Sequence, residues 1–168
     1  MRAGFGVIPG ERAIGVISDT HGLLRLEAIE ALRGSELIVH AGDIGGPQVL
    51  DGLRALAPVV AVRGNNDRDA WGSALRATEV VEVGDVHLYV LHDLHELDLD
   101  PRAAGFRAVI SGHSHRPLSE ERKGVLYLNP GSAGPRRFNL PIAVAILRVA
   151  GTSLSAEIIE LSGGRDPG

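Results

Sequence analysis

The stretch AIGVISDTHG, residues 13–22, joins a short apolar run to an aspartate, a histidine and a glycine. Its first part predicts a buried strand, because it is a continuous run rich in isoleucine and valine. The amphipathic stretch at 23–33 predicts a helix with leucine, isoleucine and alanine on one face, and 35–40 predicts a second strand. This strand–helix–strand order is typical of a parallel βαβ unit.

The rest of the chain continues this alternation and then becomes rich in strands. A helix is predicted at 47–56, with Pro47 in its first turn, where proline is favoured, and a strand is predicted at 58–63. Alternating hydrophobicity in the second half predicts a hairpin and further strands. These strands are 79–84, 86–92, 107–111, 125–129, 142–149 and 154–161. One short helix is expected within 96–106, started by an Asp-Pro pair. The pattern indicates an α/β fold in which two sheets pack face to face with helices outside.

The chain length bounds the domain organisation. With 168 residues, a single domain over residues 1–168 is expected, with irregular ends at 1–12 and 162–168. Only 4% of the residues are aromatic although 44% are hydrophobic. The core is therefore expected to consist of aliphatic side chains.

Charge and cysteine content exclude several classes of protein. The net charge is −4, and no broad basic face is evident, so neither duplex nucleic acid nor a membrane is expected as a partner. The absence of cysteine excludes disulfides, thiolate metal sites and a cysteine nucleophile. No membrane-length apolar run and no signal-peptide pattern are present. A cytoplasmic protein is therefore predicted.

Polar residues with metal-binding side chains follow five of the predicted strands. They are Asp19 and His21, then Asp43, then Asn65 and Asp67, then His92, then His113 and His115. Taken singly, an aspartate or asparagine at such a position is usually a turn former or helix cap. Because strand ends gather at one edge of such sheets, the whole set is expected to meet there.

The set has the chemistry of a site for two divalent metal ions. Carboxylate, amide oxygen and imidazole ligands together suit Mn²⁺, Fe²⁺, Co²⁺, Ni²⁺ or Zn²⁺. One carboxylate can bridge two such ions, as in two-metal hydrolases. Glycines at 22, 42, 64 and 112 allow the backbone to turn sharply beside these residues.

The sequence resembles the calcineurin-like metallophosphoesterases, in particular their small bacterial and archaeal phosphodiesterase branch. The motifs that carry the resemblance are DTH (19–21), GD (42–43), GNND (64–67), His92, GHSH (112–115) and NPGS (129–132). Each motif alone is weak, but their order along the chain is that of the family.

The resemblance implies a fold, a set of ligands and a reaction. The fold is a four-layer α/β/β/α sandwich of two mixed sheets flanked by helices. The first ion would be held by Asp19, His21, Asp43 and His115. The second would be held by Asp43, Asn65, His92 and His113, so that Asp43 bridges. Mn²⁺ is the first expectation, with Fe, Ni, Co or Zn as alternatives. Hydroxide formed from a bridging water would attack phosphorus in a small or nucleotide-like phosphate ester.

The sequence departs from the family at two positions near the site. Asn66 stands where many members carry a histidine, and asparagine cannot act as a general acid at neutral pH. Residues 92–95 read HDLH where relatives tend to read HGH, so His95 is an alternative to His92 as the ligand. The candidate catalytic residues are Asp43, Asn65, Asn66 and Asp67, and Asp67 either orients a metal ligand or caps a turn.

Other residues have two interpretations each. His40 either touches the edge of the site or is a buried strand histidine. Arg136 and Arg137 either bind a substrate phosphate or form a solvated pair. Trp71 and Arg68 either lean over the cleft or pack within their loop.

Four functions remain open at this point. A phosphodiesterase is the leading hypothesis, and a phosphomonoesterase of the protein-phosphatase kind is its competitor among enzymes. The resemblance also extends to a retromer subunit that acts as an interaction scaffold, although all seven ligands are present here. Metal binding without turnover is the fourth possibility. A homodimer is possible, because the strand-rich C-terminal half offers a sheet edge.

Overall fold

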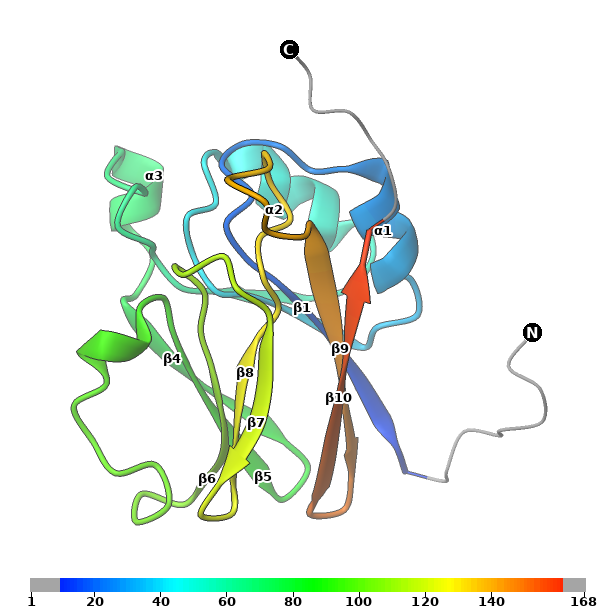
Figure 1. Ribbon diagram of the computed structural model, residues 1–168, viewed down its shortest axis with the longest axis vertical. Coiled ribbons are helices and arrows are strands. Elements are labelled where there is room, and N and C mark those ends of the chain that lie inside the picture. Colours follow the sequence, from blue (N-terminus) through cyan, green and yellow to red (C-terminus); the bar gives the residue numbers. More distant parts are fainter. Residues whose placement is uncertain (1–9, 162–168) are drawn as a thin grey trace.

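The computed structural model describes residues 10–161, and its first sheet has the strand order β10-β9-β1-β2-β3 (Figure 1). These strands are β1 (Arg12–Ile17), β2 (Leu37–His40), β3 (Val59–Ala61), β9 (Ala143–Ala150) and β10 (Ser153–Glu160). Strands β1, β2 and β3 are parallel, whereas β9 and β10 run antiparallel to their neighbours. The βαβ units predicted in the first half therefore form the parallel part of this sheet.

The second sheet has the strand order β4-β5-β6-β8-β7. Its strands are β4 (Thr78–Val83), β5 (Val86–Leu91), β6 (Phe106–Ile110), β7 (Leu118–Arg122) and β8 (Val125–Asn129). The central strands β5, β6 and β8 are parallel, and the edge strands β4 and β7 are antiparallel to them. Aliphatic side chains from both sheets, including Val16, Val39, Leu88 and Ile110, form the core between them.

Helices α1 (Leu26–Leu32) and α2 (Pro47–Arg54) cover the outer face of the first sheet (Figure 1). The outer face of the second sheet is covered by the 3-10 helix η1 (Leu94–Glu96) and the loop after it, with Tyr89 and Val109 beneath them. The predicted α/β sandwich of two mixed sheets is thus confirmed. Its fourth layer is a single 3-10 turn and a loop. Between residues 10 and 161, no helix is long and apolar enough to cross a membrane.

Three local predictions differ from the structure. The helix expected within 96–106 is wrong: the Asp100 carboxylate accepts the backbone N–H of Arg102 and Ala103, and only turns follow. Strand β7 and the short helix α3 (Ala70–Ser73) were not predicted. The predicted irregular lead-in ends earlier than residue 12, because β1 already begins at Arg12. The rest of the predicted irregular ends, 1–9 and 162–168, lies outside the described residues.

Candidate metal centre

The loops that follow β1, β2, β3, β5 and β6 meet at one edge of the two sheets. Backbone hydrogen bonds connect them: the Asp19 N–H donates to the carbonyl of Gly42, and the Gly112 N–H donates to the carbonyl of His92. The first bond joins two loops of the first sheet, and the second joins two loops of the second sheet. The His113 N–H donates to the Asp19 carboxylate at 3.1 Å and so joins the loops of the two sheets, which brings the predicted ligands together.

The backbone at these residues is strained. Seven non-glycine residues in the described part of the chain have a positive φ, and five of them are predicted ligands. These five are Asp19 (55°), His21 (46°), Asp43 (55°), His113 (70°) and His115 (62°). Positive φ is unfavourable for residues with a Cβ and persists where the surroundings impose it, often at functional sites.

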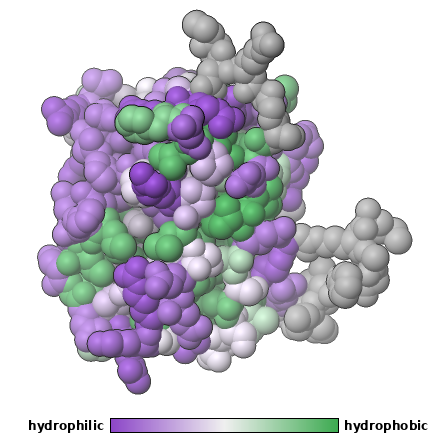
Figure 2. All heavy atoms as spheres, in the orientation of Figure 1, coloured by the Kyte–Doolittle hydropathy of each residue, from purple (hydrophilic) through white to green (hydrophobic). Residues whose placement is uncertain are grey.

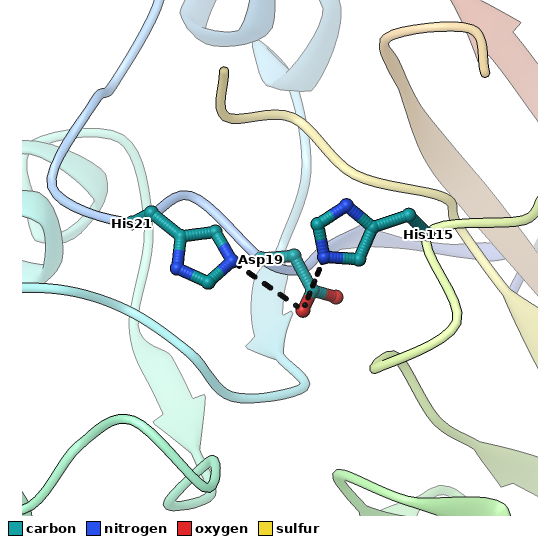
Figure 3. A group of neighbouring side chains, drawn as sticks. All are labelled: Asp19, His21 and His115. Atoms are coloured by element: carbon teal, nitrogen blue, oxygen red, sulfur yellow. Dashed lines mark ion pairs between the residues drawn. The ribbon is translucent and has the colours of Figure 1, made fainter. Parts of the chain in front are cut away.

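The carboxylate of Asp19 lies at the centre of one group of ligands. Its Oδ1 atom lies 3.3 Å from Nε2 of His115 and 3.9 Å from Nε2 of His21, and Figure 3 shows both rings pointing a nitrogen at this oxygen. Its Oδ2 atom accepts hydrogen bonds from the Ser18 hydroxyl at 2.6 Å and the His113 N–H at 3.1 Å. One oxygen is thus anchored by protein donors, and the other faces the imidazoles.

The carboxylate of Asp43 organises a second group. Its Oδ2 atom lies 3.4 Å from Nε2 of His92 and 3.8 Å from Nε2 of His21. Nδ1 of His92 lies 2.7 Å from the carbonyl oxygen of Ala41, which can only accept, so Nδ1 carries the proton. In neutral His92, the lone pair of Nε2 therefore faces the Asp43 carboxylate, an arrangement that calls for a cation or a second proton.

Asn65 and His113 complete the set on the open side. Nδ1 of His113 lies 3.3 Å from the side-chain oxygen of Asn65, and both residues are exposed. Nε2 of His113 lies 3.7 Å from Oδ2 of Asp93.

The residues present fit divalent metal ions. Among the buried side-chain atoms without a hydrogen-bond partner are Asp19 Oδ1, His21 Nε2, His92 Nε2 and His115 Nδ1. Buried polar atoms are rarely left unsatisfied, and a bound cation would satisfy the first three. Two groups hold ligand atoms within 4.8 Å of one another, namely Asp19 with His21 and His115, and Asp19 with Asp43 and His92. In this geometry Asp19 belongs to both groups, whereas the sequence predicts Asp43 as the bridge.

The charges of these groups support the same interpretation. Burial raises the pKa of Asp43, but the adjacent His92 and the hydrogen bond donated by the Asn66 N–H lower it more, to about 2. Burial lowers the pKa of His21, and the carboxylates of Asp43 and Asp19 offset this only in part. Burial also lowers the pKa of His92, but the Asp43 and Asp19 carboxylates raise it more, so its net shift is upward. An ionised carboxylate that attracts a proton onto a neighbouring imidazole also attracts a metal cation.

Asp67 lies outside the ligand cluster and holds two loops together. Its carboxylate accepts the backbone N–H groups of Ile44, Gly45 and Gly64 at 2.9 to 3.1 Å, and the residue is only 1% exposed. It therefore links the segment that carries Asp43 to the segment that carries Asn65.

His40 is a buried strand histidine that acts on the same loops. Its Nδ1 accepts the Gly42 N–H at 3.1 Å, so Nε2 carries the proton and donates to the Thr20 hydroxyl at 3.0 Å. Thr20 in turn donates to the carbonyl of Ile44 at 2.7 Å. Burial lowers the pKa of His40 to about 4, so the ring is neutral. A role for Thr20 was not predicted. The only signal in the sequence was its position between the predicted ligands Asp19 and His21 in the DTH motif.

Two glycines permit the close approach of the loops. A Cβ at Gly64 would collide with the backbone and side chain of Asp43, and one at Gly112 would collide with Ser18 and Asp19. No larger residue fits at these positions without moving a predicted ligand.

The alternatives left open near residues 92–95 differ sharply in position. His92 is buried in the cluster, whereas the His95 side chain is 94% exposed and its Nδ1 lies 3.1 Å from Asp93. Asn66 is at the open side, where its backbone N–H and its side-chain amide donate to the two oxygens of Asp43 at 2.9 and 3.2 Å.

The remaining candidates lie around the site. Arg68 donates to the carbonyl of Asn65 at 2.9 Å, and Trp71 packs against the core cluster beneath α1 and α2. Arg137 is near enough to His21 for its charge to contribute to the lowered pKa of that histidine. Arg136 donates to the carbonyl of Leu140 at 3.4 Å.

Comparisons with known proteins give relatives in sequence and in fold. Residues 13–152 match the profile of the calcineurin-like phosphoesterase superfamily domain. A probable metallophosphoesterase of Methanothermobacter thermautotrophicus is 41% identical over 157 residues, which cover 87% of this chain and 91% of that protein. The structure of an archaeal phosphodiesterase is similar with a TM-score of 0.74 and 25% identity, covering 88% of this chain and 99% of that one. Vps29 of Chaetomium thermophilum, at 17% identity and a TM-score of 0.72, shares the fold over 91% of this chain and 100% of its own.

Proposed function

Because the chain belongs to the calcineurin-like phosphoesterase superfamily, we propose that it is a dinuclear, metal-dependent phosphodiesterase acting on a small or nucleotide-like phosphate ester. The observation that carries the proposal is the set of buried carboxylate and imidazole atoms that face one another without hydrogen-bond partners. The similarity to an archaeal phosphodiesterase supports the choice of a diester over a monoester.

The proposal assigns the metal ligands by the family pattern. Asp19, His21, Asp43 and His115 would hold one ion, and Asp43, Asn65, His92 and His113 the other. Mn²⁺ is favoured, with Fe, Ni, Co or Zn as alternatives, because this mixed set of oxygen and nitrogen donors suits all of them. When bound, the ions would supply charge for the phosphate oxygens and a water of lowered pKa.

Other residues of the protein hold the ligand loops in place and face the position of the substrate. Asp67 and His40 hold the backbone of the loops, so the ligands are preorganised. Asn66 lies on the open side and can donate a hydrogen bond to a substrate oxygen, but it cannot protonate a leaving group. We therefore expect the enzyme to prefer esters whose leaving groups are stable as anions.

An interaction scaffold is the second candidate, since Vps29 shares the fold. Against it, the seven predicted ligands are all present and five of them are held with strained backbone angles at one edge. A cytoplasmic location and a homodimer stay predictions.

The test is hydrolysis of bis-p-nitrophenyl phosphate and p-nitrophenyl phosphate by chelator-treated protein, with and without Mn²⁺. We expect Mn²⁺ to restore activity, with the diester preferred. The Asp43→Asn variant should lose this activity. The control is Asp51→Asn, which changes an exposed aspartate paired with Arg54 on α2. Preference for the monoester would favour a phosphomonoesterase, and no turnover by metal-loaded protein would favour the scaffold.

A further inference from the structure

A cavity of about 400 Å³ lies beside the metal centre, between η1 and the start of β7. Its wall includes Leu94, His113, Pro117, Leu118 and Asn129. His113 is both a predicted ligand and part of this wall, so the cavity adjoins the open side of the centre. Figure 2 shows hydrophobic residues at the surface over the position that η1 and the start of β7 take in Figure 1.

The polar groups of the wall are already occupied by one another. The Asn129 amide donates to the carbonyl of Gly112 at 2.9 Å and to the Ser114 hydroxyl at 3.1 Å, and its oxygen accepts the Gly131 N–H at 2.9 Å. The Ser114 hydroxyl also accepts the N–H of Arg116 at 3.2 Å. Apart from the charged side chains at its mouth, the wall offers a ligand the hydrocarbon of Leu94, Pro117 and Leu118 and the face of an imidazole.

The mouth of the cavity carries side chains of both charges, Asp93 and Arg116. The Asp93 carboxylate lies 3.7 Å from Nε2 of His113, and it accepts both the N–H and Nδ1 of His95. The exposed Arg116 is the cation in the wall.

The same wall is where the sequence departs from its family. Asp93 and Leu94 belong to the HDLH segment that replaces the HGH of relatives. The cavity is therefore lined partly by this segment and partly by Gly112, His113 and Asn129 of the GHSH and NPGS motifs.

We propose that this cavity binds one neutral, aromatic ester group of the substrate while the phosphate lies at the metal centre. The inference rests on the proposed function and names its substrate class: diesters with at least one aromatic substituent, as opposed to small alkyl diesters. The volume suits an aromatic ring, since ligand pockets of about 300 Å³ and more enclose small organic groups. A ring buries much apolar area for few lost rotations and can lie against the His113 imidazole.

The first test measures equilibrium binding, by calorimetry, of diphenyl phosphate and dimethyl phosphate to Mn²⁺-loaded protein. Burial of one phenyl ring predicts at least about tenfold tighter binding of diphenyl phosphate. Leu118→Arg should fill the cavity and reduce the preference to within about twofold, while binding dimethyl phosphate as the wild type does. Leu94→Arg is a second variant in case the first does not fold. The control is Leu26→Arg on α1, where the wild-type side chain is 70% exposed. Equal binding of the two phosphates by wild type, or a preference that survives both variants, would overturn the proposal.

Turnover of bis-p-nitrophenyl phosphate separates this proposal from the proposed function. If the protein hydrolyses bis-p-nitrophenyl phosphate but does not prefer diphenyl phosphate in binding, only the aromatic subsite is refuted. If the wild type prefers diphenyl phosphate, Leu118→Arg abolishes this preference, and no turnover is seen, the aromatic subsite is supported and the phosphodiesterase function is refuted. If neither phosphate binds and no turnover is seen, both the aromatic subsite and the phosphodiesterase function are overturned.

Discussion

Replacement of Asp67 by alanine is predicted to destabilise the metal-free protein, because its carboxylate accepts three backbone N–H groups. Two of the donors, Ile44 and Gly64, are buried, and the third, Gly45, is exposed and can bond to water. A hydrogen bond to a charged group contributes about 1.5–3 kcal/mol, and a buried donor left without a partner costs about 1–3 kcal/mol. Counting only the two buried donors at about 1.5–3 kcal/mol each, Asp67→Ala should lower the free energy of unfolding by about 3–6 kcal/mol.

Asp67→Asn refines this prediction. Asparagine keeps one acceptor oxygen but turns an amide towards the remaining donor, so the loss should be about half as large. The assay is urea unfolding of chelator-treated protein, followed by circular dichroism at constant pH. Asp69→Ala is the matched control, because Asp69 precedes α3, is exposed, and makes no side-chain capping bond; its effect should stay below about 0.5 kcal/mol. An Asp67→Ala variant as stable as the control would refute the view that this carboxylate holds the two loops.

Four further predictions concern the site. The pKa of His40 is about 4 in the folded protein, below the ordinary 6.5, so the unfolded chain takes up the proton at a higher pH than the folded protein does. The free energy of unfolding should therefore fall as the pH drops from 6.5 to 4. In urea unfolding of metal-free protein, His40→Asn should show a smaller fall. Mn²⁺ at about 100 times its dissociation constant should raise the free energy of unfolding by about 2.7 kcal/mol for each ion bound, and a thermal melt of Asp43→Asn should show most of this gain lost. His92→Ala should reduce the rate of diester hydrolysis at least about 100-fold and His95→Ala no more than about threefold, because only the former points into the cluster; equal effects would show that the ligand is misassigned. Asn66→His should raise kcat for an alkyl diester about tenfold or more while leaving p-nitrophenyl esters nearly unchanged, since only the poor leaving group needs a proton.

The convergence of the ligands was predictable from the sequence, because it depends on strand direction. Residues 13–18 and 35–40 were expected as parallel strands, and parallel strands deliver their carboxyl ends to one edge. Once β1 and β2 pair in this way, Asp19 and Asp43 lie close together whatever the details of the loops.

The choice between His92 and His95 depended on a feature without a clear pattern. The 3-10 turn of η1, whose first N–H groups bond back to Asp93, directs His95 to solvent. A turn of only three residues is too short to show a helical repeat of hydrophobic residues in the sequence. The sequence allowed Asp67 as an orienting residue or turn cap and His40 as a buried strand histidine, but it could not identify the backbone N–H groups that they accept, because every residue except proline offers one.

The incorrect or missing elements have local causes. Strand β7 reads LSEER and lies at a sheet edge, so it lacks the alternation of a half-buried strand. The helix expected within 96–106 ended as a turn, because Gly105 has a positive φ of 87° directly before β6. Both errors leave the ligand edge of the sheets unchanged.

The most direct test of the dinuclear centre is the number of metal ions bound per chain. Wild-type protein and Asp43→Asn would be stripped, reloaded with Mn²⁺, freed of unbound metal, and measured by mass spectrometry of the metal against protein concentration. The account predicts two ions per wild-type chain and at most one in Asp43→Asn. One ion or none in the wild type, or two in the variant, would contradict it.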